Sequence, residues 1–284
     1  QVLNAPDLNE QITEVNFNLW QKLFHDSNKQ TKGERIPDLV YLEIETLVTE
    51  LLVRIHLKDK NSLIYKALFD EKYKELGHKY FNNVPGGFSI EKGWGTYMFW
   101  AMDEKKHRVK LKLEDGNLVS EDAKYKFAFD ADGIATALRN KEIYPGMLLC
   151  YLMVSLFYGM KCLGGFCQVS DLTKTKEAWG KILTEMGENE EAEALIPVQT
   201  KELGGDGLVL SYLKTQNGDI LPATGIDMVL EEDDTSYETY IELSKNVTLS
   251  EMMDPMLPEI YTVLYPIQDR EERLLSLSPE EISK

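Results

Sequence analysis

The sequence predicts an α+β protein, mostly helical, with two antiparallel β-hairpin or meander segments around a buried central helix. Three observations support this prediction. Apolar residues recur at helical spacing along much of the chain, which is typical of amphipathic helices. At two places, runs of strand-forming residues are joined by Asp-Gly or Asn-Gly, the strongest short hairpin signals. One run, Tyr144–Met160, is apolar on every side, as expected of a helix buried all round.

We expect residues 1–284 to form a single globular domain, because the sequence has no internal repeat and no low-complexity linker. There is also no alternation of strands and helices that would indicate a doubly wound sheet. The expected sub-structure is helical over 1–82, a β-meander over 83–129, helical with the buried helix over 130–190, a β-hairpin over 200–232 and helical over 233–284.

The N-terminal part predicts three helices. Apolar spacing places them at Leu8–Phe24, Pro37–Leu57 and Leu63–Tyr80. In the second of them, the apolar residues fall on one face of the helix, which should pack against the core.

The meander is predicted from aromatic and alternating residues. The run Thr96–Met102 is aromatic and strand-like, and His107–Glu114 alternates apolar with polar residues. Asp115-Gly116 then predicts a two-residue hairpin turn. One face of this meander should be buried against helices.

The following helices are expected at Asp130–Asn140 and Ser170–Met186, on either side of the buried run. Pro145 suits the first turn of a helix, where a missing N–H costs nothing. The run is shorter than the roughly 18–20 apolar residues that a membrane span needs, so we expect a core helix. It ends at a loop that contains Gly164-Gly165.

The C-terminal part predicts a second hairpin with its turn at Asn217-Gly218, in which Pro222 should bend a strand or mark an edge. Helices should follow. Capping boxes are expected at Thr248–Glu251 and Ser278–Glu281.

Charge and cysteine content limit the partners and the compartment. The formal net charge of −17 argues against nucleic acid and against an anionic membrane surface, both of which attract clustered Lys and Arg. A basic protein is the partner that this charge would suit, although it equally serves solubility. Three cysteines exclude a dense disulfide framework and favour a reducing, cytoplasmic location.

The loop after the buried helix is the first candidate site. Gly164 and Gly165 would allow positive φ angles and a close approach of a ligand, and the amide of Gln168 would orient it. N–H groups at the start of the next helix would suit an anion. The competing interpretation is a helix cap and tight turn between two packed helices.

The cysteines of this loop offer chemistry without a complete site. Cys167 is a candidate nucleophile, but it would need a histidine and an orienting group from elsewhere in the fold. Cys162 and Cys167 do not make up the four ligands of structural zinc, and Cys150 is a helix away. We therefore expect no metal site, predict no particular cofactor, and favour buried, unreactive thiols over a nucleophile.

The aromatic meander is the second candidate site. Trp94, between two glycines, and Thr96 would line a small-molecule pocket, although aromatic residues of a sheet also serve the core. Glu45 is a further catalytic candidate, in a polar strip with His56. The two are about 16 Å apart along a helix, too far to act as an acid–base pair.

Two functions remain open from the sequence. We favour an enzyme acting on a small polar metabolite, with the glycine loop, the Trp94–Thr96 segment and Glu45 lining one pocket. The alternative is a non-catalytic binding or assembly module with an acidic surface. The remaining histidines, His25, His78 and His107, lie in polar contexts and are expected at the surface.

Overall fold

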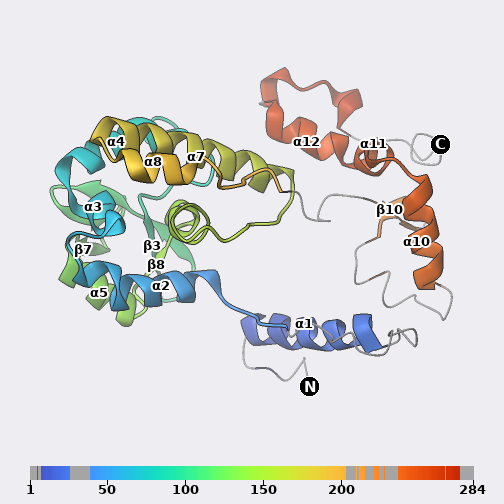
Figure 1. Cartoon of the computed structure of the whole chain (residues 1–284), viewed down its shortest axis with the longest axis horizontal. Coiled ribbons are helices and arrows are strands. Elements are labelled where there is room, and N and C mark those ends of the chain that lie inside the picture. The colour runs from blue at the N-terminus through green and yellow to red at the C-terminus, as the bar shows by residue number, and fades with distance from the viewer. Residues whose placement is uncertain are drawn as a thin grey trace. The chain divides into compact units, whose positions relative to one another are not determined.

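The computed structural model describes residues 5, 8–25, 39–202, 209, 211–214, 220–223, 227, 236–265 and 267–275. Contacts group the chain into two compact units, one with residues 1–43, 209–255 and 277–284, the other with residues 44–208 and 256–276. As the sequence predicts, the architecture is α+β, mostly helical, with antiparallel sheets of two or three strands (Figure 1).

In the first unit, the described residues include helices α1, α10 and α11 and strands β9 and β10. Strand β9 pairs antiparallel with β10, and Pro222 lies opposite Tyr212 at the end of the pair. Thr248 and Glu251 form the predicted capping box at the start of α11. The turn Asn217-Gly218 and the segment Ser278–Glu281 lie outside the described residues. The bounds are α1 Leu8–His25, β9 Tyr212–Lys214, β10 Ile220–Pro222, α10 Ser236–Asn246 and α11 Leu249–Met253.

The second unit begins with α2 (Ile44–Arg54), which is shorter than predicted. The chain from residue 39 to 43 is not helical, and α2 gives way to a 3₁₀ turn at His56–Lys58. The predicted helix Leu63–Tyr80 is also wrong in one respect, because it is two helices, α3 (Leu63–Phe69) and α4 (Glu71–Phe81). Asp70 separates them, since its carboxylate accepts hydrogen bonds from two N–H groups of α4 and caps it.

Eight short strands, β1–β7 of the predicted meander and β8 after α5, form three separate sheets. The three sheets have the orders β1-β2, β4-β3-β8 and β5-β6-β7, all antiparallel. Asp115 and Gly116 both have positive φ, as the predicted hairpin turn between β5 and β6 requires. The bounds are β1 Phe88–Ser89, β2 Trp94–Gly95, β3 Phe99–Met102, β4 Arg108–Lys110, β5 Lys112–Glu114, β6 Asn117–Val119, β7 Lys126–Ala128 and β8 Ile143–Pro145.

The buried helix is present and comprises α6 (Met147–Cys150) and a π-helix at Tyr151–Phe157. Residues 148–156 are all buried, as predicted, but Met147 and residues 157–160 are exposed, so the run Tyr144–Met160 is buried only in its middle. Figure 1 shows this helix end-on, in yellow-green, between α2 and α7. Its start was predicted too early: Tyr144 and Pro145 belong to β8, where Pro145 pairs with Phe99 on an edge strand, a position that tolerates proline.

Further helices complete this unit. Asp130 caps α5 through the N–H of Gly133, as expected for a helix over 130–140. Helix α7 packs on α4 and starts four residues earlier than predicted, so it includes Cys167 and Gln168. The bounds are α5 Ala131–Arg139, α7 Phe166–Met186, α8 Asn189–Leu195 and α12 Leu257–Leu264, with 3₁₀ turns at Asp254–Met256, Ile267–Asp269 and Glu272–Leu274.

Candidate functional site

The glycine loop after the buried helix has a different geometry from the one expected. The residue with positive φ at the end of that helix is Gly159, with φ 69°. Gly165 has φ −75° and is the residue before α7, and Gly164 is not in the left-handed region either. The chain therefore does not use the positive φ that Gly164 and Gly165 would allow, because the left-handed residue lies five positions earlier.

The side chain of Gln168 lies over Gly164. A Cβ on Gly164 would come within 2.7 Å of the Gln168 side-chain oxygen. Both polar atoms of that amide are buried and have no hydrogen-bond partner among the described residues. The side chain of Gln168 thus occupies the space beside Gly164 that a ligand would need. A ligand role for Gly164, Gly165 and Gln168 stays a prediction.

The two catalytic candidates lie in separate surroundings. Glu45, in the first turn of α2, forms an ion pair with Arg108, with 3.1 Å between Oε1 and the guanidinium nitrogen. The Cys167 thiol is free and exposed, and it makes no hydrogen bond within the described part of the chain. Burial raises the pKa of the neighbouring Cys162 thiol.

Trp94 and Thr96 line a cavity of about 280 Å³, which we call the Trp94 cavity. It lies between the β1–β2 hairpin, α4 and the β5–β6 hairpin. Glu45, Gly164, Gly165 and Gln168 are not in its lining, so the expected convergence on one pocket does not occur here. The lining consists of His78, Phe88, Ser89, Ile90, Gly93, Trp94, Gly95, Thr96, Tyr97, Lys110, Leu111, Lys112, Leu113, Val119 and Glu121.

Gly95 allows the hairpin that carries Trp94 to form. Its φ is 76°, and a Cβ there would overlap the Gly87 carbonyl oxygen and lie 2.7 Å from Phe88 Cα. Only glycine permits both the left-handed backbone and this close approach. The pairing of Ser89 with Trp94 then places the indole at the cavity.

Thr96 has a structural position in the lining. Its buried hydroxyl donates to the carbonyl oxygen of Phe99 or of Leu111, and it accepts from the Leu111 N–H at 3.0 Å. These bonds hold Leu111 between β4 and β5, which explains why the predicted strand His107–Glu114 is divided. With its hydrogen bonds satisfied by backbone, Thr96 shapes the cavity wall.

His78 is the lining residue that the sequence analysis misplaced. Its ring stacks on Tyr97, with centroids 4.7 Å apart and planes 9° apart, and meets the edge of Phe88 at 5.6 Å. Burial lowers the pKa of His78, so the imidazole is neutral at pH 7. Within the described part of the chain it forms no hydrogen bond. In the sequence, His78 directly follows Leu76 and Gly77, which are both buried in α4. These two residues are the only hint in the sequence that this part of the helix faces inward.

Charged side chains surround the cavity mouth. The Lys110 ammonium donates to the Gly93 carbonyl oxygen, which ties β4 to the turn before Trp94. Lys112 is paired with Glu114 at 3.3 Å, and Glu121 adds a carboxylate. The Ser89 and Thr96 hydroxyls in the lining are hydrogen-bonded to protein atoms, so the His78 imidazole, the Tyr97 hydroxyl and the charged groups are the polar groups that a ligand could meet.

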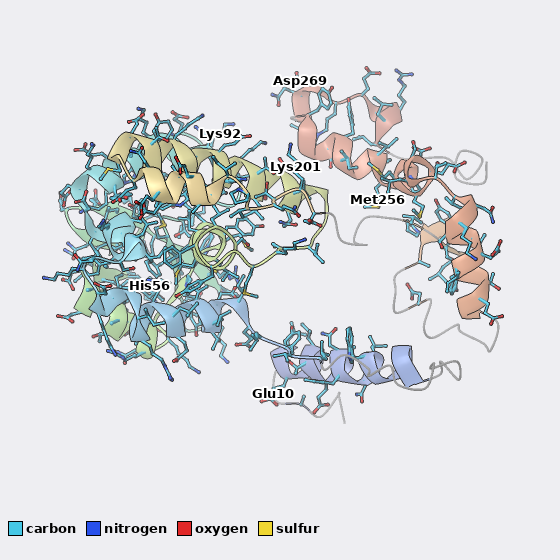
Figure 2. The ribbon with its side chains drawn as sticks, in the orientation of Figure 1. Glu10, His56, Lys92, Lys201, Met256 and Asp269 are labelled. Carbon is cyan, nitrogen blue, oxygen red and sulfur yellow. The ribbon has the colours of Figure 1, made fainter. Side chains whose placement is uncertain are left out.

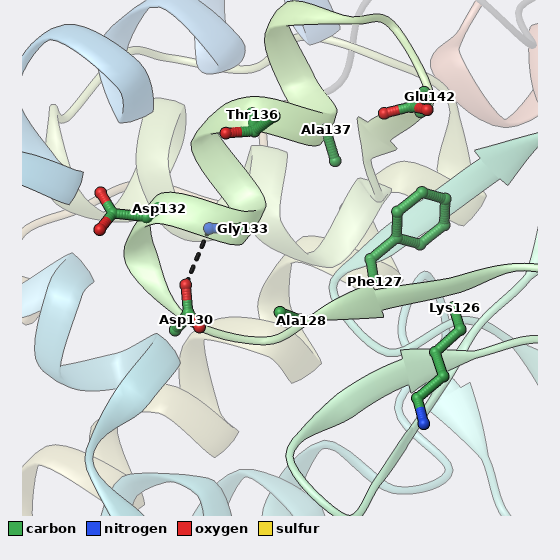
Figure 3. A pocket seen from close by; sticks show the side chains of 9 residues that line it. All are labelled: Lys126, Phe127, Ala128, Asp130, Asp132, Gly133, Thr136, Ala137 and Glu142. Atoms are coloured by element: carbon green, nitrogen blue, oxygen red, sulfur yellow. Dashed lines mark hydrogen bonds between the residues drawn. The ribbon is translucent and has the colours of Figure 1, made fainter.

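A second, shallower groove of about 560 Å³ lies at the start of α5 (Figure 3). It contains three carboxylates. Asp130 is used as the cap of α5, at 2.8 Å from the Gly133 nitrogen, and Asp132 and Glu142 lie at opposite ends of the groove. The carboxylates do not converge on one point, so this groove has no assembled binding centre.

Comparison with known proteins found no matching family model, no matching curated protein and no matching solved structure. Within the described residues, no helix is long and apolar enough to cross a membrane. The same residues contain no group of three or more His, Cys, Asp or Glu side chains arranged to hold a metal ion.

Proposed function

We propose that this protein binds a small, flat molecule in the Trp94 cavity. The observation that supports this is a neutral imidazole that has no hydrogen-bond partner among the described residues and lies among aromatic walls: His78 stacks on Tyr97, and Trp94 and Phe88 are also in the lining. Small-molecule sites are mostly apolar with a few converging polar groups, and this cavity has that composition.

The size and chemistry of the cavity define the ligand further. A volume of about 280 Å³ lies at the lower limit of small-molecule sites, roughly 300–1,000 Å³, so the ligand is small. Aromatic walls favour a ring that can stack or meet them edge-on. A hydroxyl, amide or carboxyl group on that ring would satisfy the free nitrogen of His78.

Catalysis in this cavity would depend on the same histidine. An enzyme acting on a small polar metabolite needs a group that touches the ligand and transfers a proton, and a neutral imidazole has that capacity. His78 is the residue of the lining that meets this requirement at neutral pH.

The test uses two tryptophans. Indole and 4-hydroxybenzoate serve as probes, and their dissociation constants are measured by ligand-observed NMR with the full chain. Trp94→Leu should weaken binding about tenfold, because an aromatic contact contributes about 0.5–1.5 kcal/mol beyond its buried area. Trp100→Leu is the matched control, since Trp100 is also half-buried but is not in the lining.

Two outcomes would contradict the proposal. One is that neither probe binds the wild type, and the other is that both leucine variants weaken binding equally. His78→Phe keeps the stacked ring and removes the nitrogens, so it should weaken 4-hydroxybenzoate, whose polar groups His78 would bind, more than indole.

We further infer a reducing, cytoplasmic environment, supported by three free thiols at Cys150, Cys162 and Cys167.

The alternative function, association of an acidic surface with a basic protein, rests on the net charge of −17. It predicts binding that weakens as salt is added.

A further inference from the structure

A buried histidine away from the Trp94 cavity has hydroxyl partners on both ring nitrogens. His56, labelled in Figure 2, is 3% exposed and begins the 3₁₀ turn after α2. Its Nδ1 lies 2.7 Å from Ser62 Oγ, and its Nε2 lies 2.9 Å from the Tyr158 hydroxyl. The three side chains therefore form a continuous chain of hydrogen bonds.

The ring is in the state that a general base requires. Burial lowers the pKa of His56, and the nearby carboxylate of Asp59 partly offsets this by raising it. A neutral imidazole has one donor and one acceptor nitrogen. We assign the proton to Nε2, which then donates to Tyr158, and this leaves Nδ1 to accept the hydroxyl proton of Ser62.

Ser62 does not perform the task that its position in the fold would favour. It precedes α3, where serine usually caps the helix and contributes about 1 kcal/mol, yet its side chain makes no capping bond. The hydroxyl binds His56 instead. Ser62 is only partly buried, whereas His56 is almost fully buried, so the hydroxyl is more accessible than the imidazole that it binds.

The surroundings of this group are apolar and exposed. Phe157 and Tyr158 meet the His56 ring edge-on, with centroids at 5.3 and 5.8 Å, and both remain 41% exposed. Ile55, the residue before His56 in the chain, is also exposed. Tyr158 follows directly on the π-helix, and such wide turns often occur at functional sites.

We propose that Ser62 is a nucleophile for acyl transfer, with His56 as its general base and Tyr158 as the residue that positions the base. Acyl transfer of this kind needs a nucleophile that is hydrogen-bonded to a general base, and a third group that orients the base. The exposed apolar side chains suit a carboxylic ester with an apolar acyl chain. This proposal does not depend on the Trp94 cavity.

The reaction balances as hydrolysis of an ester. Ser62 Oγ forms a bond to the ester carbonyl carbon while its proton moves to Nδ1 of His56. The bond from that carbon to the alcohol oxygen then breaks, and His56 gives the proton to the departing alcohol. Water attacks the acyl-serine in the same way, with His56 again taking and returning a proton, so the products are an acid and an alcohol.

The test is covalent labelling of the full chain with an alkyl fluorophosphonate. Attack by Ser62 forms an O–P bond and expels fluoride, and peptide mass spectrometry locates the adduct. We expect labelling at Ser62 of the folded wild type, and a loss of at least about 100-fold in rate for His56→Gln, because general bases contribute roughly 10²–10⁴. His107→Gln, at an exposed histidine paired with Asp103, should label at the wild-type rate.

The wild type alone can overturn the proposal. If folded wild-type protein is not modified at Ser62, or is modified there no faster than urea-unfolded protein, Ser62 is not an activated nucleophile. The role of Tyr158 has its own readout, the ¹⁵N NMR shifts of the His56 ring. Tyr158→Phe should move the ring proton from Nε2 toward a mixture of tautomers, and an unchanged tautomer would contradict the positioning role.

Discussion

Thr96→Val should destabilise the protein because valine keeps the shape of threonine but lacks the hydroxyl. The variant leaves the buried Leu111 N–H without a partner, which costs about 1–3 kcal/mol, and it loses a donated bond of about 1 kcal/mol net. We expect a total loss of about 2–4 kcal/mol in the free energy of unfolding. The measurement is urea denaturation, with the midpoint lowered and the slope unchanged.

Thr96→Ser is the matched control. It keeps the hydroxyl and removes one methyl group, which lies 3.3 Å from the place a Cβ would take on Gly146, so it should cost about 1 kcal/mol. If the valine variant is as stable as the serine variant, the hydroxyl does not hold Leu111 and our account of the divided strand fails. A stable valine variant that loses probe binding would make Thr96 a ligand residue instead.

Three further predictions concern the hairpin, an ion pair and the core. Gly95→Ala should unfold the β1–β2 hairpin and abolish probe binding, whereas Gly93→Ala, in open space with φ 62°, should cost only about 1–2 kcal/mol; equal loss in circular dichroism melts would refute this. The hydrogen bond from Lys66 lowers the pKa of Glu188 below 4.5, so Glu188 stabilises the fold above that pH and the gain disappears as the pH falls through the folded-state pKa. Glu188→Gln should therefore reduce the free energy of unfolding at pH 7 by up to about 1 kcal/mol, seen as a lower melting temperature. Below the folded-state pKa of Glu188 the two proteins should melt at the same temperature. Leu52→Ala, at a fully buried position, should cost about 2–5 kcal/mol in urea denaturation, and a loss below about 1 kcal/mol would place Leu52 outside the core.

The sequence was sufficient where the structure follows from local signals. The run over 148–156 marks the buried helix because its side chains are apolar apart from Ser155 and the hydroxyl of Tyr151. Asp130 and Thr248 cap helices at the predicted places, and Asp115-Gly116 supplies the two left-handed residues of a hairpin turn. The grouping of residues 1–284 into one domain stays a prediction.

The sequence was insufficient where distant residues decide. The predicted strand is divided at Leu111 because of a hydrogen bond to Thr96, fifteen residues earlier. The alternation of apolar and polar residues along the strand gives no sign of that bond. His78 contacts Tyr97 and His56 contacts Tyr158, both from other elements, so neither the polar context of His78 nor the polar strip that contains His56 reveals these environments. Trp94 was chosen because glycines flank it, and those glycines are what bring it to the cavity wall.

The π-helix at Tyr151–Phe157 holds more residues than an α-helix with the same number of turns. Removal of one residue within the segment would allow ordinary α-helical bonds to form, and the tighter turns would make up for the missing residue. In an α-helix such as α7, the same deletion would rotate all side chains beyond it by about 100° around the axis. Tyr158 would therefore keep its direction toward His56, so a single-residue deletion should disturb the residues that follow less here than in α7.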